Sequence, residues 1–239
     1  MVLAGLVLLG CEQPSPSLDQ VVKKNANATG GRDAIEAVKS IEVDLHIVDP
    51  GFAADGIYRA TRTGKMRIDV MIAGEHVFTE ACNGTRGWEW SGKGEAVDCS
   101  AAATVALRHG VELPGKLFGL HEMQARGHGV ELLTNQQIEG NDYHVLRLAF
   151  ADGYSTSLYV DTKSGLITRR REVRALHVDI DPPPTTIETL SSDFRKIAGV
   201  MFSFSNVEVD LKSGKVLERT TVRSVKVNPV FNERIFDVL

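Results

Sequence analysis

The stretch "SIEVDLHIVDPG", residues 40–51, decides the fold class of this chain. Apolar side chains alternate with polar ones from Ile41 to Ile47, and a period of two predicts a β-strand with one buried face. Asp49-Pro50-Gly51 follows directly and predicts a tight turn. An antiparallel β-sheet is therefore expected to begin here.

Comparable runs occur along the rest of the chain, on both sides of a helical middle segment. Further strands are expected at residues 56–63, 65–72, 76–82, 187–198, 200–211 and 215–228. With shorter runs between them, the chain carries about ten or eleven strands. This pattern predicts an α+β protein, mostly antiparallel β, built as a single strongly curved sheet.

Two short helices are expected before the first strand, broken at Gly30-Gly31. Ser17 and Gln20 have the spacing of a capping box, in which each side chain bonds the backbone N–H of the other residue.

The middle segment, residues 101–125, is expected to form two more helices, with Pro114 at the first position of the second. These helices would cover the concave face of the sheet as a mobile lid. Their apolar side chains would close a ligand cavity, and the residues expected there are Leu113, Leu117, Phe118 and Leu120.

Four stretches resemble a known family. They are "ATGGRDAIEAVKSI" (28–41), "CNGTRGWEW" (82–90), "LYVDTKSGLITRR" (158–170) and "SDFRKIAGVMFSF" (192–204). These stretches are similar to the LolA/LolB-like outer membrane lipoprotein-sorting proteins. The resemblance implies one domain over residues 19–239, an incomplete, half-open β-barrel with helices as a lid.

The N-terminal residues also resemble a bacterial export signal. The apolar run Val2–Leu9 is much shorter than the roughly 20 residues that span a bilayer, and Leu8-Leu9-Gly10-Cys11 is similar to a lipobox. The resemblance implies that residues 1–10 are a signal peptide and that Cys11 carries diacylglycerol and an acyl group such as palmitate. Residues 11–18 would be a flexible tether, and Glu12 implies the outer membrane. The alternative is a buried N-terminal segment with an incidental cysteine.

Two further cysteines, Cys82 and Cys99, remain if Cys11 is lipidated. In an oxidising periplasm they are predicted to form a disulfide. The alternative is two free, separately buried thiols, because pairing cannot be read from sequence alone.

Composition and motifs exclude several classes of function. The 239 residues have a net charge of −4, which provides no basic face for nucleic acid. "HEMQARGH", residues 121–128, lacks a zinc-protease spacing, since Ala125 stands where the second His is needed. No nucleophile elbow, P-loop or Rossmann fingerprint occurs. We therefore expect no catalytic activity, no metal and no cofactor.

Two motifs could contribute to a binding site. In "ITRRREVR", residues 167–174, strand alternation places Arg170 and Arg174 on one face and Arg169 and Arg171 on the other. They form either a lipid-headgroup site or a solvated outer face with one or two interior ion pairs. Trp88 and Trp90 share one face of a strand and line either the ligand cavity or the core.

The function expected from these features is that of a lipid-anchored envelope protein. Its concave apolar cavity would bind an acyl chain or a lipidated partner, as a lipid or lipoprotein carrier. The alternative is an envelope stress-sensing or assembly component that binds a partner protein through the same fold. A carrier should contain a deep apolar pocket, and a sensor a filled interior.

Overall fold

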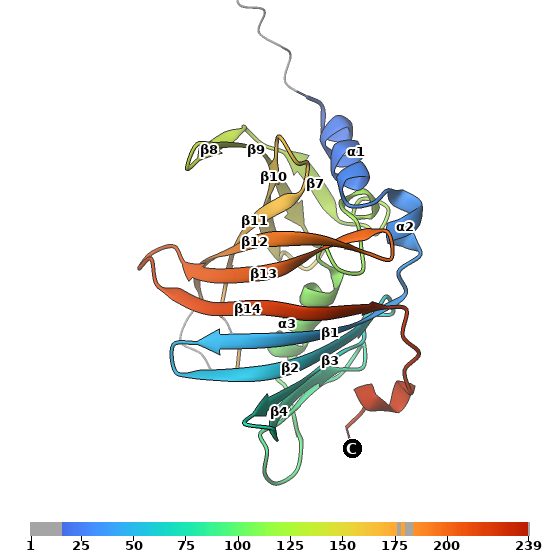
Figure 1. The fold of residues 1–239 in the computed structure, drawn as a ribbon, viewed down its shortest axis with the longest axis vertical. Helices are drawn as coiled ribbons and strands as arrows, with labels where there is room; N and C mark the ends of the chain where they lie inside the picture. The colour runs from blue at the N-terminus through green and yellow to red at the C-terminus, as the bar shows by residue number, and fades with distance from the viewer. Residues whose placement is uncertain (1–15, 176–177, 180–183, 239) are drawn as a thin grey trace, which may run out of the picture.

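The computed structural model describes residues 16–175, 178–179 and 184–238. Its strands form one 14-stranded sheet with the order β6-β5-β4-β3-β2-β1-β14-β13-β12-β11-β10-β9-β7, and β8 pairs with β9 (Figure 1). The fold is α+β and mostly antiparallel, as predicted. The strand count exceeds the expected ten or eleven because β6, β7 and β8 have only two to four residues, too few for an alternation to be recognised.

The bounds of the elements are as follows. The helices are α1 (Leu18–Ala28), α2 (Arg32–Glu36) and α3 (Ala101–Glu112), with short 3-10 helices η1 (Leu120–Glu122) and η2 (Glu233–Phe236). The strands are β1 (Ser40–Asp49), β2 (Phe52–Thr61), β3 (Met66–Ile72), β4 (Glu75–Cys82), β5 (Gly87–Trp90), β6 (Val97–Asp98), β7 (Gly129–Leu132), β8 (Gln136–Ile138), β9 (Asn141–Ala149), β10 (Ser155–Asp161), β11 (Ile167–Arg174), β12 (Thr185–Ile197), β13 (Val200–Asp210) and β14 (Val216–Val227).

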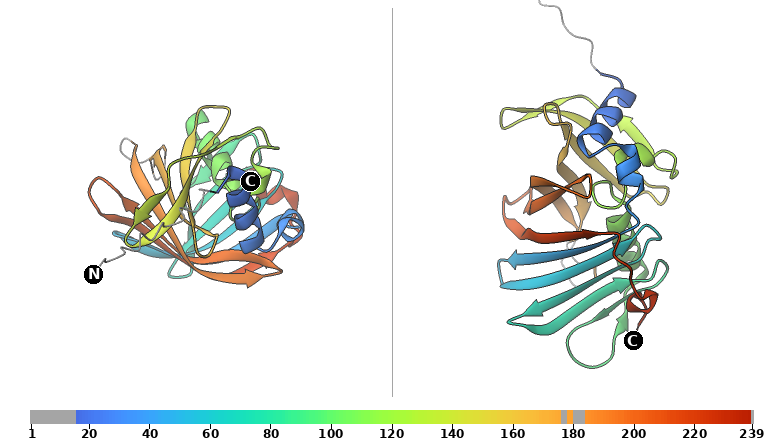
Figure 2. Two further views of the ribbon diagram at one scale, coloured as in Figure 1. Left: turned by 90° about the horizontal axis from the view of Figure 1, so that it is seen from above. Right: turned by 45° about the vertical axis from the view of Figure 1, so that its right-hand side comes forward.

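The strand order explains why helical segments cover one face. β1 pairs with β14 in the middle of the sheet, while β6 and β7 lie at its two edges. The chain between them must therefore pass from one edge to the other. It does so through α3 and residues 113–128, and the view from above shows the sheet curving into a partial barrel around these segments (Figure 2).

The N-terminal helices form as predicted. The Ser17 hydroxyl accepts a hydrogen bond from the Gln20 N–H at 3.3 Å, and the Gln20 side chain accepts one from the Ser17 N–H at 2.8 Å. Gly30 lies between α1 and α2 with φ at +124°, and a Cβ there would lie 2.1 Å from the Gly199 carbonyl oxygen. A glycine is therefore required where this link crosses the β12–β13 turn.

The second helix expected in the middle segment does not form. α3 is present, but Leu113–Gly119 is a tight turn, closed by a 2.9 Å hydrogen bond from the Gly115 N–H to the Phe118 carbonyl. Pro114 pairs with Phe118 in an isolated bridge instead of beginning a helix. We call Leu113–Gly119 the plug loop. Its apolar residues fix it by packing, since Leu117 and Phe118 are 0% and 2% exposed.

The main hydrophobic core lies where the plug loop and η1 meet the sheet. It includes Ile41, Leu117, Leu120, Met123, Leu146 and Leu158. All six side chains are almost fully buried, and each contributes about 1.5–3 kcal/mol relative to an exposed side chain. The core therefore joins both halves of the sheet through the crossing segment.

Candidate functional site

A cavity of about 710 Å³ opens on the concave side of the sheet. One wall comes from the inward-facing residues of β1, because alternation turns Ile41, Val43, Leu45 and Ile47 to the same side. The neighbouring strands extend this apolar wall. They contribute Tyr58, Ile68, Val70, Val222 and Val225.

Gly56 gives this wall its depth. It lies in β2 opposite Leu45, and a Cβ at this position would lie 2.7 Å from the Leu45 Cδ1 atom. The absence of a side chain on β2 leaves room for the Leu45 side chain to lie along the strand.

The mouth of the cavity is apolar and open to solvent. β1 ends, β2 begins and β3 ends at the same end of the sheet, because the three strands are consecutive hairpins. Val48, Phe52 and Ile72 lie there with exposures of 39%, 47% and 40%, and Phe52 and Ile72 line the cavity. Asp49 pairs with Phe52 and also lines the cavity, so a ligand that enters at this end meets two large apolar side chains and one carboxylate.

The plug loop brings a cation into the cavity. Lys116 lies at the tip of the turn, and its ammonium nitrogen is 4.7 Å from the centre of the Tyr58 ring. Lys116 is an exposed residue and lies on the lining of the cavity. Burial, together with the positive charge of Arg170, lowers the pKa of Lys116 to about 8. Among the residues that the structure describes, no carboxylate lies within ion-pair distance of this ammonium.

A strip of charged side chains begins at the opposite wall, where Arg170 and Glu208 line the cavity. Glu172, with a side chain 2% exposed, forms ion pairs with Arg170 at 2.9 Å and with Arg174 at 3.0 Å. Arg174 also bonds Glu208 at 2.7 Å, and the Tyr154 hydroxyl donates to Glu172. Burial would raise the pKa of Glu172, but the two arginines and the hydroxyl lower it.

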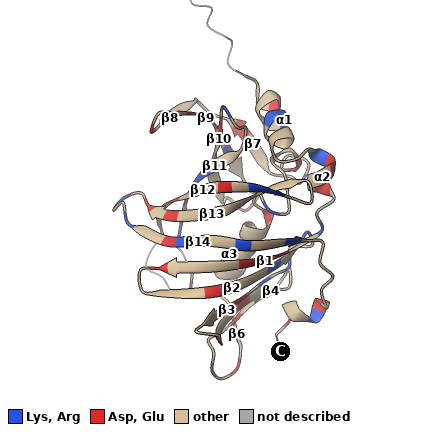
Figure 3. Cartoon of the chain, viewed as in Figure 1, with Lys and Arg blue, Asp and Glu red and all other residues tan. Residues whose placement is uncertain are grey.

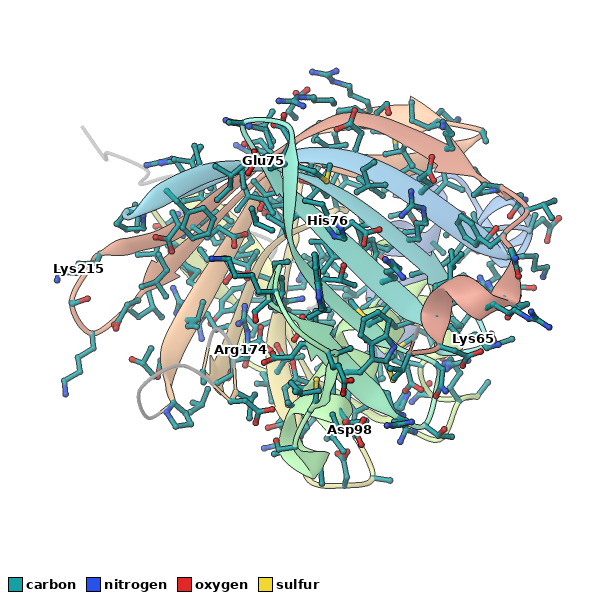
Figure 4. The ribbon with its side chains drawn as sticks, turned by 90° about the horizontal axis from the view of Figure 1, so that it is seen from below. Lys65, Glu75, His76, Asp98, Arg174 and Lys215 are labelled. Carbon is teal, nitrogen blue, oxygen red and sulfur yellow. The ribbon has the colours of Figure 1, made fainter. Side chains whose placement is uncertain are left out.

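This strip extends from the edge of the cavity into the core. Arg174 lies within the curve of the sheet in the view from below (Figure 4). Arg170 lines the cavity, and its Nε atom is buried without a hydrogen-bond partner among the described residues. Along the described strands, acidic and basic residues are interspersed (Figure 3).

The four arginines of β11 have the predicted alternation. Arg170 and Arg174 point inward, where Arg170 opposes Leu158 in β10 and Thr189 in β12. Arg169 and Arg171 point outward and bond Glu188 at 3.1 and 2.7 Å. Interior ion pairs and a paired outer face are both present.

The four predicted lid residues separate into two pairs. All are buried, with exposures of 6% at Leu113, 0% at Leu117, 2% at Phe118 and 2% at Leu120. Phe118 and Leu120 line the cavity. Leu113 and Leu117 instead belong to the core cluster, so their expected place at the cavity wall is wrong.

Trp88 and Trp90 do not line the cavity. They oppose Ala81 and Thr79 in β4, whose side chains lie on the convex face with Arg67 and Asp69. Trp88 is 2% exposed and donates to the Phe236 carbonyl at 2.9 Å. The alternation correctly places both tryptophans on one face, but that face is the outer one, covered at Trp88 by η2.

The predicted disulfide between Cys82 and Cys99 is absent, and both thiols are free. Gly87 explains this, since Cys82 pairs with it from β4 and the Cys99 N–H donates to its carbonyl at 3.0 Å from the other side. Two strand spacings of about 4.8 Å separate the cysteines, more than the roughly 7 Å that a disulfide can bridge. Cys11, the signal peptide and most of the tether lie outside the described residues.

Neither metal ligation nor a membrane-spanning helix is found in the described part of the chain. No group of three or more His, Cys, Asp or Glu side chains there could hold a metal ion. No helix within residues 16–175, 178–179 and 184–238 is long and apolar enough to cross a membrane.

Lys116 and Tyr58 are the site residues that sequence reasoning missed. Tyr58 occupies an inward position of a predicted strand, so alternation could have identified it. No comparable sequence pattern identifies Lys116 as a site residue, because the segment around it is predicted to be helical.

No protein-family model matches the sequence, and no curated protein matches it. A LolA superfamily protein from Nitrosomonas europaea is 16% identical, with a TM-score of 0.58 over 91% of this chain and 96% of that chain. The chain has a LolA-like fold.

Two further solved structures share the LolA-like fold. A DUF1329 family protein from Desulfovibrio piger is 10% identical, with a TM-score of 0.58 over 92% of this chain and 96% of that chain. A domain from Vibrio parahaemolyticus described as an outer membrane lipoprotein-sorting protein is 9% identical, with a TM-score of 0.56 over 91% and 94% of the chains. The resemblance predicted from four short stretches is thereby confirmed at the level of the fold.

Proposed function

We propose that this LolA-like protein binds an acyl chain, of a lipid or of a lipidated protein, in its concave cavity and acts as a non-catalytic carrier. The cavity of about 710 Å³, with its apolar wall and apolar mouth, is the observation that carries this proposal. Cavities of about 300–1,000 Å³ enclose one small ligand. The apolar lining therefore suits a single aliphatic chain.

The energetics favour this ligand. Each methylene removed from water contributes about 0.8 kcal/mol, so a twelve-carbon chain offers roughly 9 kcal/mol before the cost of association. The apolar residues along β1 and at the mouth provide continuous contact for such a chain. A partner-protein sensor with a filled interior would lack this space.

The proposed location is the bacterial cell envelope. The chain would be anchored through lipidated Cys11 in the outer membrane and face the periplasm. The fold shared with a lipoprotein-sorting domain of Vibrio parahaemolyticus supports a role in handling lipids or lipoproteins. A membrane anchor beside an apolar cavity would keep the carrier close to its source of acyl chains.

Binding of N-phenyl-1-naphthylamine, a neutral apolar fluorophore, tests the proposal. Val70 lines the cavity and Met71, the next residue of β3, points to the convex face. We expect Val70→Trp to fill the cavity and weaken probe binding at least tenfold, while Met71→Trp leaves it unchanged. Mass spectrometry of organic extracts should also detect acyl chains that co-purify with the wild-type protein.

Two outcomes would contradict the proposal. One is a folded wild-type protein that binds no probe. The other is a folded Val70→Trp variant with the affinity of the wild type, which would place the probe outside the cavity.

A further inference from the structure

We propose that the cavity selects acyl chains that end in an acidic group, and that Lys116 and Arg170 hold this headgroup. The inference rests on the proposed function and names the ligand class. Its basis is the position of two cationic side chains on a cavity lining that combines many apolar residues with four acidic ones, which are Asp49, Glu80, Glu208 and Glu218.

The first observation is the setting of Lys116. Lys116 is exposed on the lining of the cavity, so its ammonium can be reached by a ligand there. Lys116 lies over the Tyr58 ring at 4.7 Å, and no described carboxylate pairs with it. Its neighbour Leu117 is fully buried, so the turn holds the ammonium in place inside the cavity.

The second observation concerns the hydrogen-bond and ion-pair partners of the nearby carboxylates. Glu172 and Glu208 are already bonded to Arg174, and the Glu218 carboxylate accepts a hydrogen bond from Thr220 at 2.7 Å. Glu208 and Glu218 are close enough to favour the charged form of Lys116, while Arg170 opposes it. The ammonium thus keeps its donors for a ligand.

The third observation is Arg170, which faces the same space from β11. Its guanidinium bonds Glu172 and Thr189 through one terminal nitrogen, but Nε has no partner among the described residues. A small side-chain rotation would turn this donor to an anion. A carboxylate or phosphate held between Lys116 and Arg170 would satisfy both.

The distance from this headgroup position to the mouth suits an acyl chain. Tyr58, beneath Lys116, and Phe52, at the mouth, both belong to β2. Six residues of a strand span roughly 20 Å. A chain with its acidic end at Lys116 would run along the apolar wall and leave its far end near Phe52 and Ile72.

The test compares dodecanoic acid with 1-dodecanol as displacers of N-phenyl-1-naphthylamine. The two ligands have chains of equal length and differ in the headgroup. At pH 7 we expect the wild-type protein to bind the acid at least tenfold more tightly than the alcohol. Lys116→Met should abolish this preference and keep the affinity for the alcohol, whereas Lys116→Arg should retain most of it.

Two controls test whether the preference depends on Lys116 in particular and on the acyl chain of the ligand. Lys93, an exposed loop residue, provides a matched Lys93→Met variant that should behave as the wild type. Sodium acetate, which has the headgroup without the chain, should not displace the probe at millimolar concentration. For the wild-type protein, raising the pH from 7 to 9 should lower the preference for the acid roughly tenfold as Lys116 loses its proton.

Equal affinities of the wild-type protein for acid and alcohol would overturn the inference while leaving the proposed function intact. The same holds for an undiminished preference in Lys116→Met. If that variant does not fold, an undiminished preference in Lys116→Gln would overturn it instead. A protein that binds neither ligand would contradict the proposed function itself, and the inference would fall with it.

Discussion

The ammonium nitrogen of Lys116 lies 4.7 Å from the centre of the Tyr58 ring, inside the concave cavity. The ring face partly compensates for water that the ammonium has lost, at about 0.5–2 kcal/mol. This compensation is incomplete, because the pKa of Lys116 is lowered to about 8 by burial and by Arg170. The pair therefore predicts a pH-dependent contribution to stability.

Replacing Lys116 by Met should stabilise the protein more at pH 7 than at pH 9.5. Between the folded pKa of about 8 and the ordinary lysine pKa of 10.5, the unfolded chain binds a proton that the folded chain does not. Wild-type stability therefore rises with pH in this range, and the variant lacks that rise. Urea unfolding at both pH values measures the difference, with Lys93→Met as the control. Parallel pH profiles of wild type and variant would contradict the lowered pKa of Lys116.

Leu117→Ala should lower the free energy of unfolding by about 2–5 kcal/mol. A residue of a loosely packed lid would cost less, but Leu117 is 0% exposed in the main core. Leu107→Ala, in the partly buried face of α3, should cost less and serves as the comparison. Denaturant unfolding measures both. Equal, small losses would indicate that the plug loop packs weakly.

Arg62→Met should destabilise the protein by about 3 kcal/mol and speed uptake of the fluorescent probe. Arg62 bonds Glu122 of η1 at 2.6 Å, with side chains 17% and 14% exposed, and its guanidinium also lies 4.7 Å from the Phe118 ring. These contacts tie the plug loop to the β2–β3 turn. If the segment opens as the predicted lid, this ion pair must break.

Stopped-flow fluorescence and urea unfolding measure the two effects. Arg86→Met is the matched control, because the Arg86–Asp98 pair is exposed and such pairs contribute about 0–1 kcal/mol. Unchanged uptake in Arg62→Met would show that the loop does not gate the cavity.

Burial would raise the pKa of Glu122, but Arg62 and the Gly119 N–H lower it. The contribution of the pair should therefore be present above the ordinary glutamate pKa of 4.5 and decline as the pH falls below it.

Cys82 and Cys99 should both be recovered as free thiols from protein unfolded without reductant. Gly87 separates them in the sheet, so a bond between them would require the strands to move. In the folded protein both should react slowly with iodoacetamide at pH 8. Burial and the carboxylates of Glu80, Glu89 and Asp179 raise the pKa of Cys99 to about 12, and burial raises the pKa of Cys82. Peptide mass spectrometry after alkylation checks this, and a linked peptide pair would disprove it.

Cys11→Ser should move the protein from the membrane fraction to the soluble fraction. A single acyl chain anchors only marginally, whereas the two or three chains expected on a lipidated Cys11 hold firmly. Fractionation with and without the substitution, together with the mass of the N-terminal peptide, provides the measurement. An unmodified peptide in a membrane-bound protein would rule out Cys11 as the anchor.

The sequence by itself determined the class of the fold and the positions of its long elements. Alternation in β1, the capping box at Ser17 and the break at Gly30-Gly31 are local features. They depend on backbone preference and on burying one face, which neighbouring residues encode. For the same reason alternation correctly separated Arg170 and Arg174 from Arg169 and Arg171.

Only the tertiary structure decided which face of the sheet is concave and what enters it. Trp88 and Trp90 share a face as expected, but the curvature of all 14 strands makes it the outer face. Gly87 separates Cys82 from Cys99 because strand order, a non-local property, places it between them. Lys116 faces Tyr58, 58 positions earlier in the sequence, because the chain must cross from edge strand β6 to edge strand β7. Local patterns predict which residues alternate, but the cavity and its charge arise from this long-range path of the chain.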